Sequence, residues 1–278
     1  MTEPELFRVT VVRPRRGLLD IGLGPLVEYR HLVAFFAWRD ISVRYKQTFL
    51  GVLWALLQPV ATMVIFTIVF SKAAKIDSQG VPYPLFSYAA LIPWTFFATS
   101  LDKASNSLVG NANLIQKVYF PRMISPISSV VSGLFDFAIT FLVLVLLMLY
   151  YGTPLTWRIV FLLPLTALAF VTALAVGLWL SALNVRFRDV RYTIPFLTQI
   201  WLLATPVAYP STLLDERWRV AYALNPMVGV VEGFRWSLLG LEPAPSASLA
   251  VSAVVAVIAL LSGALFFARL ERSFADLI

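Results

Sequence analysis

Long apolar runs separated by short polar segments dominate the chain. A helix that crosses the roughly 30 Å hydrocarbon core of a bilayer needs about 20 apolar residues, because each residue rises about 1.5 Å. The runs that approach this length predict six transmembrane helices and an all-α integral membrane protein. They cover 49–70, 85–101, 123–151, 158–183, 193–210 and 247–268, and the second continues into a polar tail.

A further apolar run at 224–240 is shorter and carries charges near its middle. Its charged residues Glu232 and Arg235 lie one helical turn apart and could pair. Such a segment is too short and too charged to cross lipid readily, so we expect a re-entrant outer helix or hairpin before the last span. A seventh span is the alternative. Asn225 and Pro226 are suited to begin this helix, because proline is favoured at the first helical position.

The distribution of lysine and arginine predicts how the spans are oriented. With the N-terminus inside, sixteen of these residues fall in the segments expected inside and six in those expected outside. Because cytoplasmic loops carry the excess, both termini are expected to be cytoplasmic. The first apolar run begins too late and is too long for a cleaved signal peptide. The expected organisation is a cytoplasmic segment at 1–48, a transmembrane domain at 49–268 and a cytoplasmic tail at 269–278.

The composition agrees with a membrane protein: 59% of the residues are hydrophobic and 13% are charged, and the mean hydropathy is +0.81. These values lie outside the range of ordinary soluble domains. The net charge of +7 is therefore attributed to topology and to contact with anionic membrane lipids. No nucleic-acid partner is expected, because the spans hold the basic residues apart in separate loops.

Few residues could carry chemistry of their own. The chain has no cysteine and a single histidine, His31, so neither a disulfide nor a metal site is expected. It contains no G-x-x-x-x-G-K-[ST], H-E-x-x-H or G-x-S-x-G motif, and no catalytic residue is predicted. Asp136 lies within a span, where it is expected to face the bundle interior and to hydrogen-bond to hydroxyls such as those of Ser132 or Thr140. A secondary transporter or membrane enzyme would need more such groups.

Four separated segments resemble a known family. They are RDISVRYKQTFLGVLWALLQP from residue 39, PWTFFATSLDKASNSLVGNANLIQKVYFPR at 93–122, LNVRFRDVRYTIPFL at 183–197 and LNPMVGVVEGFRWSLLG at 224–240. In this order they resemble the membrane permeases of ATP-binding cassette type 2 exporters, which move O-antigen, capsular polysaccharide and teichoic acid. The resemblance implies a homodimer of six-span subunits served by two copies of a separate ATPase subunit. The ATPase would bind ATP and Mg, and this chain would bind no cofactor.

The resemblance implies two elements that couple the permease to its ATPase. Residues 26–47 would form an interfacial helix along the cytosolic leaflet, although a plain basic flank that fixes topology is the alternative. The segment at 106–122 would contain a short coupling helix that docks in a cleft of the ATPase, unless it is an ordinary solvated loop. The coupling residues would be Arg39, Asp40, Arg44, Tyr45, Asn113, Leu114, Ile115, Gln116 and Lys117.

Cationic and aromatic side chains are the expected contacts of the transported molecule. Arg39 and Arg44, together with a second cluster, are expected to ring the inner mouth and to attract the pyrophosphate of a lipid-linked glycan. The resemblance places the channel along the first and fifth spans, which favours Trp54 and Trp201 as surfaces for sugar stacking. Interfacial belts or helix packing are the alternative roles for these aromatic residues. The second cluster consists of Arg186, Arg188 and Arg191.

An outer gate formed by Asn225, Pro226, Glu232 and Arg235 is also implied, with a packed external cap as the alternative. The function that follows from the resemblance is export of a lipid-linked polysaccharide of the O-antigen type across a bacterial inner membrane. A permease of the same class that moves teichoic acid, another lipid or a drug is the alternative function.

Overall fold

The computed structural model describes residues 23–46, 51–213, 215, 218, 221–241, 244, 246–271 and 274, and within these residues it is helical and has no strand. The all-α prediction is thereby confirmed for this part of the chain. The α-helices are α1 (Leu23–Glu28), α2 (Arg30–Lys46), α3 (Gly51–Phe66), α4 (Tyr83–Gly110), α5 (Ala112–Lys117), α6 (Ile124–Tyr150), α7 (Leu162–Arg186), α8 (Val190–Leu203), α10 (Pro226–Leu239) and α11 (Ser246–Leu270). A π-helical turn, η1 (Thr67–Ala73), continues α3, and the 3₁₀ helices η2 (Trp157–Phe161) and η3 (Ser211–Leu213) lie in connections.

Four helices of the described residues are long and apolar enough to cross a membrane: Leu53–Ala73, Ile124–Tyr150, Trp157–Arg186 and Ala247–Leu270. They coincide with four of the six predicted spans. The predicted span at 85–101 lies inside the longer and more polar α4, and α8 ends at Leu203 instead of continuing to residue 210. Since its 14 residues rise about 21 Å, α8 by itself is shorter than the hydrocarbon core. Length and composition therefore support four spans, and the six-span count stays a prediction.

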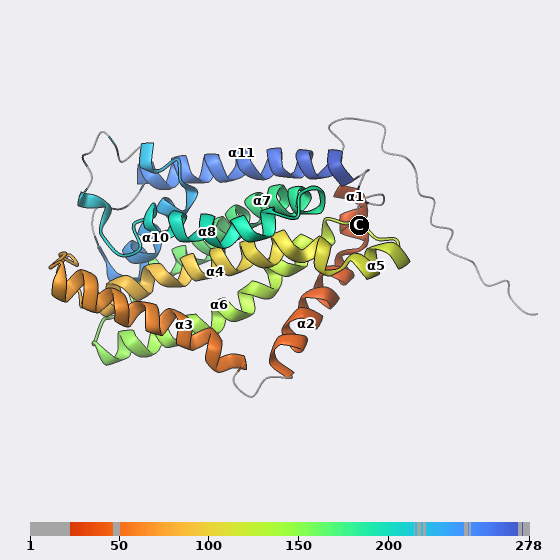
Figure 1. Ribbon diagram of the computed structural model, residues 1–278. Coiled ribbons are helices and arrows are strands. Elements are labelled where there is room, and N and C mark those ends of the chain that lie inside the picture. Colours follow the sequence, from red (N-terminus) through yellow and green to blue (C-terminus); the bar gives the residue numbers. More distant parts are fainter. Residues whose placement is uncertain are drawn as a thin grey trace, which may run out of the picture.

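Helix α4 occupies the centre of the bundle, where it contacts α3, α6, α7, α8 and α10. Figure 1 shows α1, α5 and the C-terminal end of α11 at one end of the molecule and α10 toward the other. We call these the α5 end and the α10 end. Because α4 runs between them, it links the two regions in which the sequence placed functional residues.

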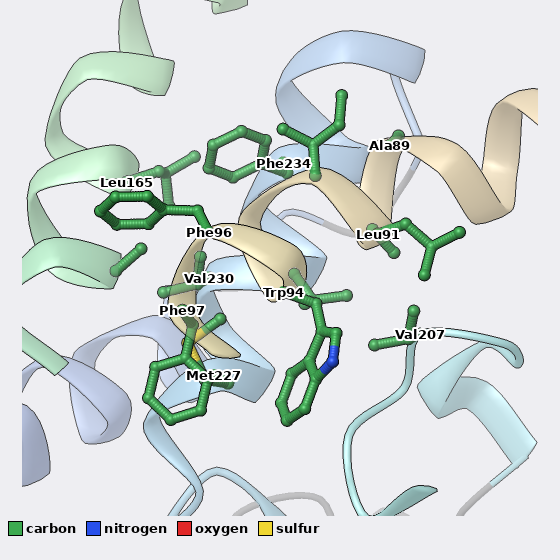
Figure 2. Packing of buried hydrophobic residues seen from close by; sticks show 14 of the residues in the cluster. Ala89, Leu91, Trp94, Phe96, Phe97, Leu165, Val207, Met227, Val230 and Phe234 are labelled. Atoms are coloured by element: carbon green, nitrogen blue, oxygen red, sulfur yellow. The ribbon is translucent and has the colours of Figure 1, made fainter. Parts of the chain in front are cut away.

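The core around α4 is built from large apolar side chains. Figure 2 shows Trp94, Phe96 and Phe97 of α4 beside Leu165 of α7 and Phe234 of α10. Phe97 and Phe234 are fully buried. Burial of this kind explains why α4 is less apolar than a lipid-facing helix: protein, and not lipid, surrounds most of it.

Small residues allow the helices to approach closely. A Cβ atom added at Gly177 of α7 would lie 2.8 Å from the Cβ of Ala104 on α4, and one added at Gly263 of α11 would lie 2.7 Å from the carbonyl oxygen of Ala175. Both separations are too short for real atoms, so these helices require glycine at their contacts. Such contacts between small residues are typical of helix packing in membranes.

Helix α10 begins and ends where the sequence predicts. The side chain of Asn225 caps it by accepting a hydrogen bond from the backbone N–H of Met227, Pro226 occupies the first turn, and Gly240 terminates it with a φ of +71°. The helix is buried along most of its length. Its 14 residues rise about 21 Å, which is short for a span. The re-entrant arrangement stays a prediction.

Candidate functional site

Asp136 lies midway along α6, and three side chains from two other helices bind its carboxylate. Lys103 Nζ on α4 is 2.7 Å and Arg44 Nη1 on α2 is 2.5 Å from Oδ2, and the Tyr45 hydroxyl donates to Oδ1. The Asp136 side chain is only 16% exposed. A buried carboxylate is costly unless it is paired and hydrogen-bonded. These four residues, which we call the Asp136 cluster, therefore tie α2 to α4 and α6.

The expected hydroxyl partners of Asp136 were wrong. The Ser132 hydroxyl donates to the carbonyl of Ser129, and the Thr140 hydroxyl donates to the backbone carbonyls of Phe137 and Asp136, not to the Asp136 carboxylate. Serine and threonine in a helix commonly bond to carbonyls of the preceding turn in this way. The Asp136 carboxylate consequently accepts hydrogen bonds from the charged and phenolic donors of other helices.

Tyr45 is held in the cluster as a proton donor. Burial raises the pKa of its phenol, and the hydrogen bond to Asp136 and the charge of that carboxylate raise this pKa further. Its ring also packs against Phe135, with the ring centroids 5.3 Å apart. The phenol therefore keeps its proton at neutral pH and binds the carboxylate.

Asn111 links a second set of elements at the α5 end. Its side-chain amide donates to the Ser107 carbonyl at 2.9 Å and to the Ser125 hydroxyl at 3.0 Å. Its carbonyl oxygen accepts from Arg39 Nη2 at 2.9 Å, and the same Arg39 nitrogen lies 2.8 Å from Asp40 Oδ1. Asn111 thus joins α2 to the end of α4 and the start of α6.

Sequence reasoning did not select Asn111 or Lys103 as site residues. An asparagine is a common helix terminator, so position 111 could have been predicted as a helix end. Its partner Arg39 is 72 positions away in sequence, and no local pattern indicates such a contact.

The expected short helix within 106–122 is present as α5. Leu114 and Ile115 are partly buried and pack on apolar clusters at the α5 end. Asn113, Gln116 and Lys117 are exposed on the other side. The helix therefore presents a polar surface outward, and docking of an ATPase on it stays a prediction.

An exposed apolar pair directly follows α5. Val118 is 53% exposed and Tyr119 is 64% exposed. Their positions next to Lys117 extend the outward surface of α5 with an aliphatic and an aromatic side chain. A mixed polar and aromatic surface is common where proteins bind one another.

The predicted inner-mouth arginines lie on different elements. Arg186, Arg188 and Arg191 are exposed at the junction of α7 and α8. Arg39 and Arg44 lie on α2, which packs on α6, and they are bound to Asn111 and Asp136. Two of the five arginines are thus held by protein partners, and a headgroup role stays a prediction for the cluster at 186–191.

The two predicted sugar-stacking tryptophans differ in their surroundings. Trp54 on α3 is 63% exposed. Trp201 on α8 is partly buried: its indole N–H donates to Asn225 Oδ1 at 2.8 Å, and its ring meets Phe97 edge to face, with the ring centroids 5.0 Å apart. The exposure of Trp54 is compatible with sugar stacking, whereas Trp201 also fixes the start of α10.

Arg235 is buried near the α10 end, where its guanidinium donates to four backbone carbonyls. The acceptors are Pro206 at 2.5 Å, Val207 at 2.6 Å, Phe86 at 3.1 Å and Tyr209 at 3.2 Å. Three of them belong to the non-helical segment 204–210 that follows α8. In a membrane protein, backbone groups freed from a helix must find partners inside the protein. Arg235 supplies these partners and fastens this segment to α4 and α10.

The predicted pair of Glu232 with Arg235 is not formed. Glu232 accepts a hydrogen bond from the Ser248 hydroxyl on α11 at 2.9 Å. The guanidinium of Arg235 is instead occupied by the carbonyls of the irregular segment. The prediction failed because it considered only the helix that carries both residues.

Asn225 is the second polar anchor of this region. Its amide donates to the Ala204 carbonyl at 3.1 Å and to the Thr205 hydroxyl at 2.9 Å. Its oxygen accepts from Trp201 and from the backbone of Met227. All four predicted gate residues therefore lie on α10 or at its N-cap, and two of them, Asn225 and Arg235, bind the segment at 204–210.

Comparison with known proteins identifies the family of this chain. The model of the ABC-2 type transporter family matches residues 31–239, which include both the Asp136 cluster and Arg235. The O-antigen export system permease protein RfbA of Myxococcus xanthus is 33% identical over 255 residues, which cover 90% of this chain and 96% of that protein. An RfbA of Klebsiella pneumoniae is 30% identical over 200 residues, covering 71% and 76% of the two chains. The polysialic acid transport protein KpsM of Escherichia coli is 24% identical over 249 residues, covering 84% and 92%. The chain therefore belongs to the ABC-2 type transporter family.

Proposed function

We propose that this chain is the transmembrane subunit of an ATP-driven exporter that moves a lipid-linked polysaccharide of the O-antigen type. The similarity to a permease of O-antigen export over 96% of that protein's length carries this proposal. The sequence has no phosphate-binding loop, so a separate cassette ATPase, in two copies, would bind ATP and Mg and supply the energy.

The chain is embedded in a membrane, as its family and its four long apolar helices indicate. We place it in the bacterial inner membrane with the α5 end and both termini in the cytoplasm. Lys117 and the arginines at 186–191 are exposed and would flank the membrane at that end, where an excess of basic residues favours the cytoplasmic side. Polymer export would then run from the α5 end toward the α10 end.

The outward surface of α5 is the proposed docking site of the ATPase. It combines the polar residues Asn113, Gln116 and Lys117 with the exposed ring of Tyr119. Contacts made here would reach the core through Leu114 and Ile115 and through Asn111, which bonds to α2 and α6. The Asp136 cluster would transmit the same motion to α4.

A second copy of the chain would complete the pathway. Helices α3 and α8 leave much of their surfaces exposed, including Trp54 and Phe196, each 63% exposed. Gln58 and Gln199 are exposed on the same helices. An amide is costly in lipid and acceptable beside protein or water. We therefore assign these faces to the homodimer interface and to the polysaccharide path between the two copies.

The segment at 204–210 together with α10 is the proposed outer gate. Arg235 and Asn225 hold its backbone against α4 and α8. Because these bonds fasten the segment to α10, the two would move as one unit. A packed cap without motion remains the alternative role.

The decisive experiment measures ATP hydrolysis by this chain co-purified with its cassette ATPase in lipid discs, with and without a lipid-linked polysaccharide. A stable complex whose turnover responds to the glycan lipid is the expected result. A stable complex that ignores the glycan lipid would favour teichoic acid, another lipid or a drug as substrate. Failure to form a complex with any cassette ATPase would overturn the proposal.

A further inference from the structure

The short helix α5 depends on tertiary contacts for its position. It has six residues, far fewer than the about 12 to 15 at which isolated helices become marginally stable in water. An extended stretch follows it, beginning with Val118, whose ψ is +132°. Neither segment could resist a force from a bound partner without support from the rest of the molecule.

One support comes from α2. Phe120 is 4% exposed and packs edge to face on Phe36 of α2, with the ring centroids 5.3 Å apart. Leu114 and Ile115 of α5 pack on the same apolar cluster. This contact holds the inner side of α5 against α2.

The other support comes from the region after α11, beyond residues 31–239 that the family model matches. The backbone N–H of Arg122 donates to Glu271 Oε1 at 3.1 Å, and Arg122 Nη1 donates to the Glu271 carbonyl. The guanidinium of Arg122 also lies 5.9 Å from the ring centroid of Phe274. One arginine, five positions after the end of α5, thus makes three contacts with Glu271 and Phe274, which follow α11.

Phe274 is seated in the core at the α5 end. It is 1% exposed and meets Phe267 of α11 edge to face, with the ring centroids 5.4 Å apart. Ile115 of α5 packs on the cluster that contains both rings. A buried phenylalanine of this kind typically contributes several kcal/mol to the packing of its surroundings, about 3 to 5 when it is truncated to alanine.

We infer that Glu271 and Phe274 are positioning residues for the ATPase-docking surface of α5, which they hold in place through Arg122. This inference rests on the proposed function. Glu271 and Phe274 then contribute to the coupling of permease and ATPase, because they connect the docking surface to α11. Helix α2 connects the same surface to α6. Removal of this support does not change the outward side chains of α5 chemically, but it shifts their positions.

The test compares Phe274→Ala and Glu271→Ala with Phe96→Ala in the full chain reconstituted in lipid discs. Phe96 is a matched control, because it is 2% exposed and packs on Phe137 in the central core, away from α5. The measurements are the Kd for the purified cassette ATPase in Mg·ATP and the unfolding temperature of the permease alone. Phe274→Leu, which retains most of the buried apolar volume, tests rescue.

Phe274→Ala and Glu271→Ala are expected to raise the Kd about tenfold, equivalent to about 1.4 kcal/mol. Phe96→Ala should lower the unfolding temperature and leave the Kd within about twofold of the value for the unaltered chain. Phe274→Leu should bring the Kd back to within about threefold of that value. Unchanged ATPase binding by both Phe274→Ala and Glu271→Ala would overturn the inference, as would an equal loss of binding in Phe96→Ala. If the unaltered chain binds no cassette ATPase, the proposed function fails first, before any variant is compared.

Discussion

Lys103 on α4 and Asp136 on α6 form an ion pair inside the helix bundle, with Nζ 2.7 Å from Oδ2. Arg44 binds the same oxygen from α2. One carboxylate therefore pairs with cations from two other helices, and the three helices meet at a single negative charge. Lys103 is the better buried of the two cations, at 18% exposed against 37% for Arg44, so it is the more costly of the two to leave without a counter-ion.

Replacement of Asp136 by asparagine should destabilise the permease by about 3 kcal/mol, because Lys103 loses its counter-ion in a buried position. Thermal unfolding of the purified protein in lipid discs measures this loss. The double variant Asp136→Asn with Lys103→Met should recover much of the stability, since no uncompensated lysine remains. Equal stability of Asp136→Asn and the unaltered chain would show that the ion pair contributes nothing.

Replacement of Arg235 by lysine should destabilise the protein by about 2 to 3 kcal/mol, because an ammonium cannot reproduce the planar fork that reaches four carbonyls. Arg186→Lys is the control: Arg186 is exposed and lies over the ring of its neighbour Phe187, 5.4 Å from the centroid. It should change stability by less than about 0.5 kcal/mol. Similar unfolding temperatures for the two variants would contradict the assigned role of Arg235.

Neutralisation of Arg186, Arg188 and Arg191 by glutamine should weaken binding of a pyrophosphate-linked glycan lipid at least about tenfold. Assembly with the ATPase should be affected much less, because these side chains lie at the junction of α7 and α8 and not on α5. Glycan-lipid binding to discs at low and high salt is the measurement, and the salt dependence should also decrease. Equal losses of lipid binding and ATPase assembly would instead indicate a structural role.

A cysteine placed at Gln116 should crosslink to the ATPase. The chain has no native cysteine, so a single introduced thiol reports one position. Gln116 is exposed on α5. Tyr150→Cys is the control, because Tyr150 is 81% exposed at the end of α6, on the side expected outside. A crosslink from residue 150 and none from residue 116 in an assembled complex would reverse the proposed orientation.

Apolar run length predicted those helices whose surfaces are compatible with lipid, namely α3, α6, α7 and α11. It was less accurate for α4 and α8, because hydropathy measures compatibility with lipid and much of α4 is surrounded by protein. The resemblance located α5, and the proline and asparagine before residue 227 located the start of α10. The partners of Asp136 and Arg235 could not be predicted, since they come from residues 26 to 149 positions away in sequence.

The burial of α4 by other helices also affects how the protein is inserted into the membrane during synthesis. Helix α4 carries Lys103 and several buried serines and is not among the four described helices that are apolar enough to cross a membrane by themselves. A segment of this kind partitions poorly into lipid from the translocon. Because Asp136 is encoded later than Lys103, α4 gains its counter-ion only after α6 has been synthesised. We therefore expect α4 to remain next to the translocon until α6 emerges, so that the two helices enter the bilayer as a pair.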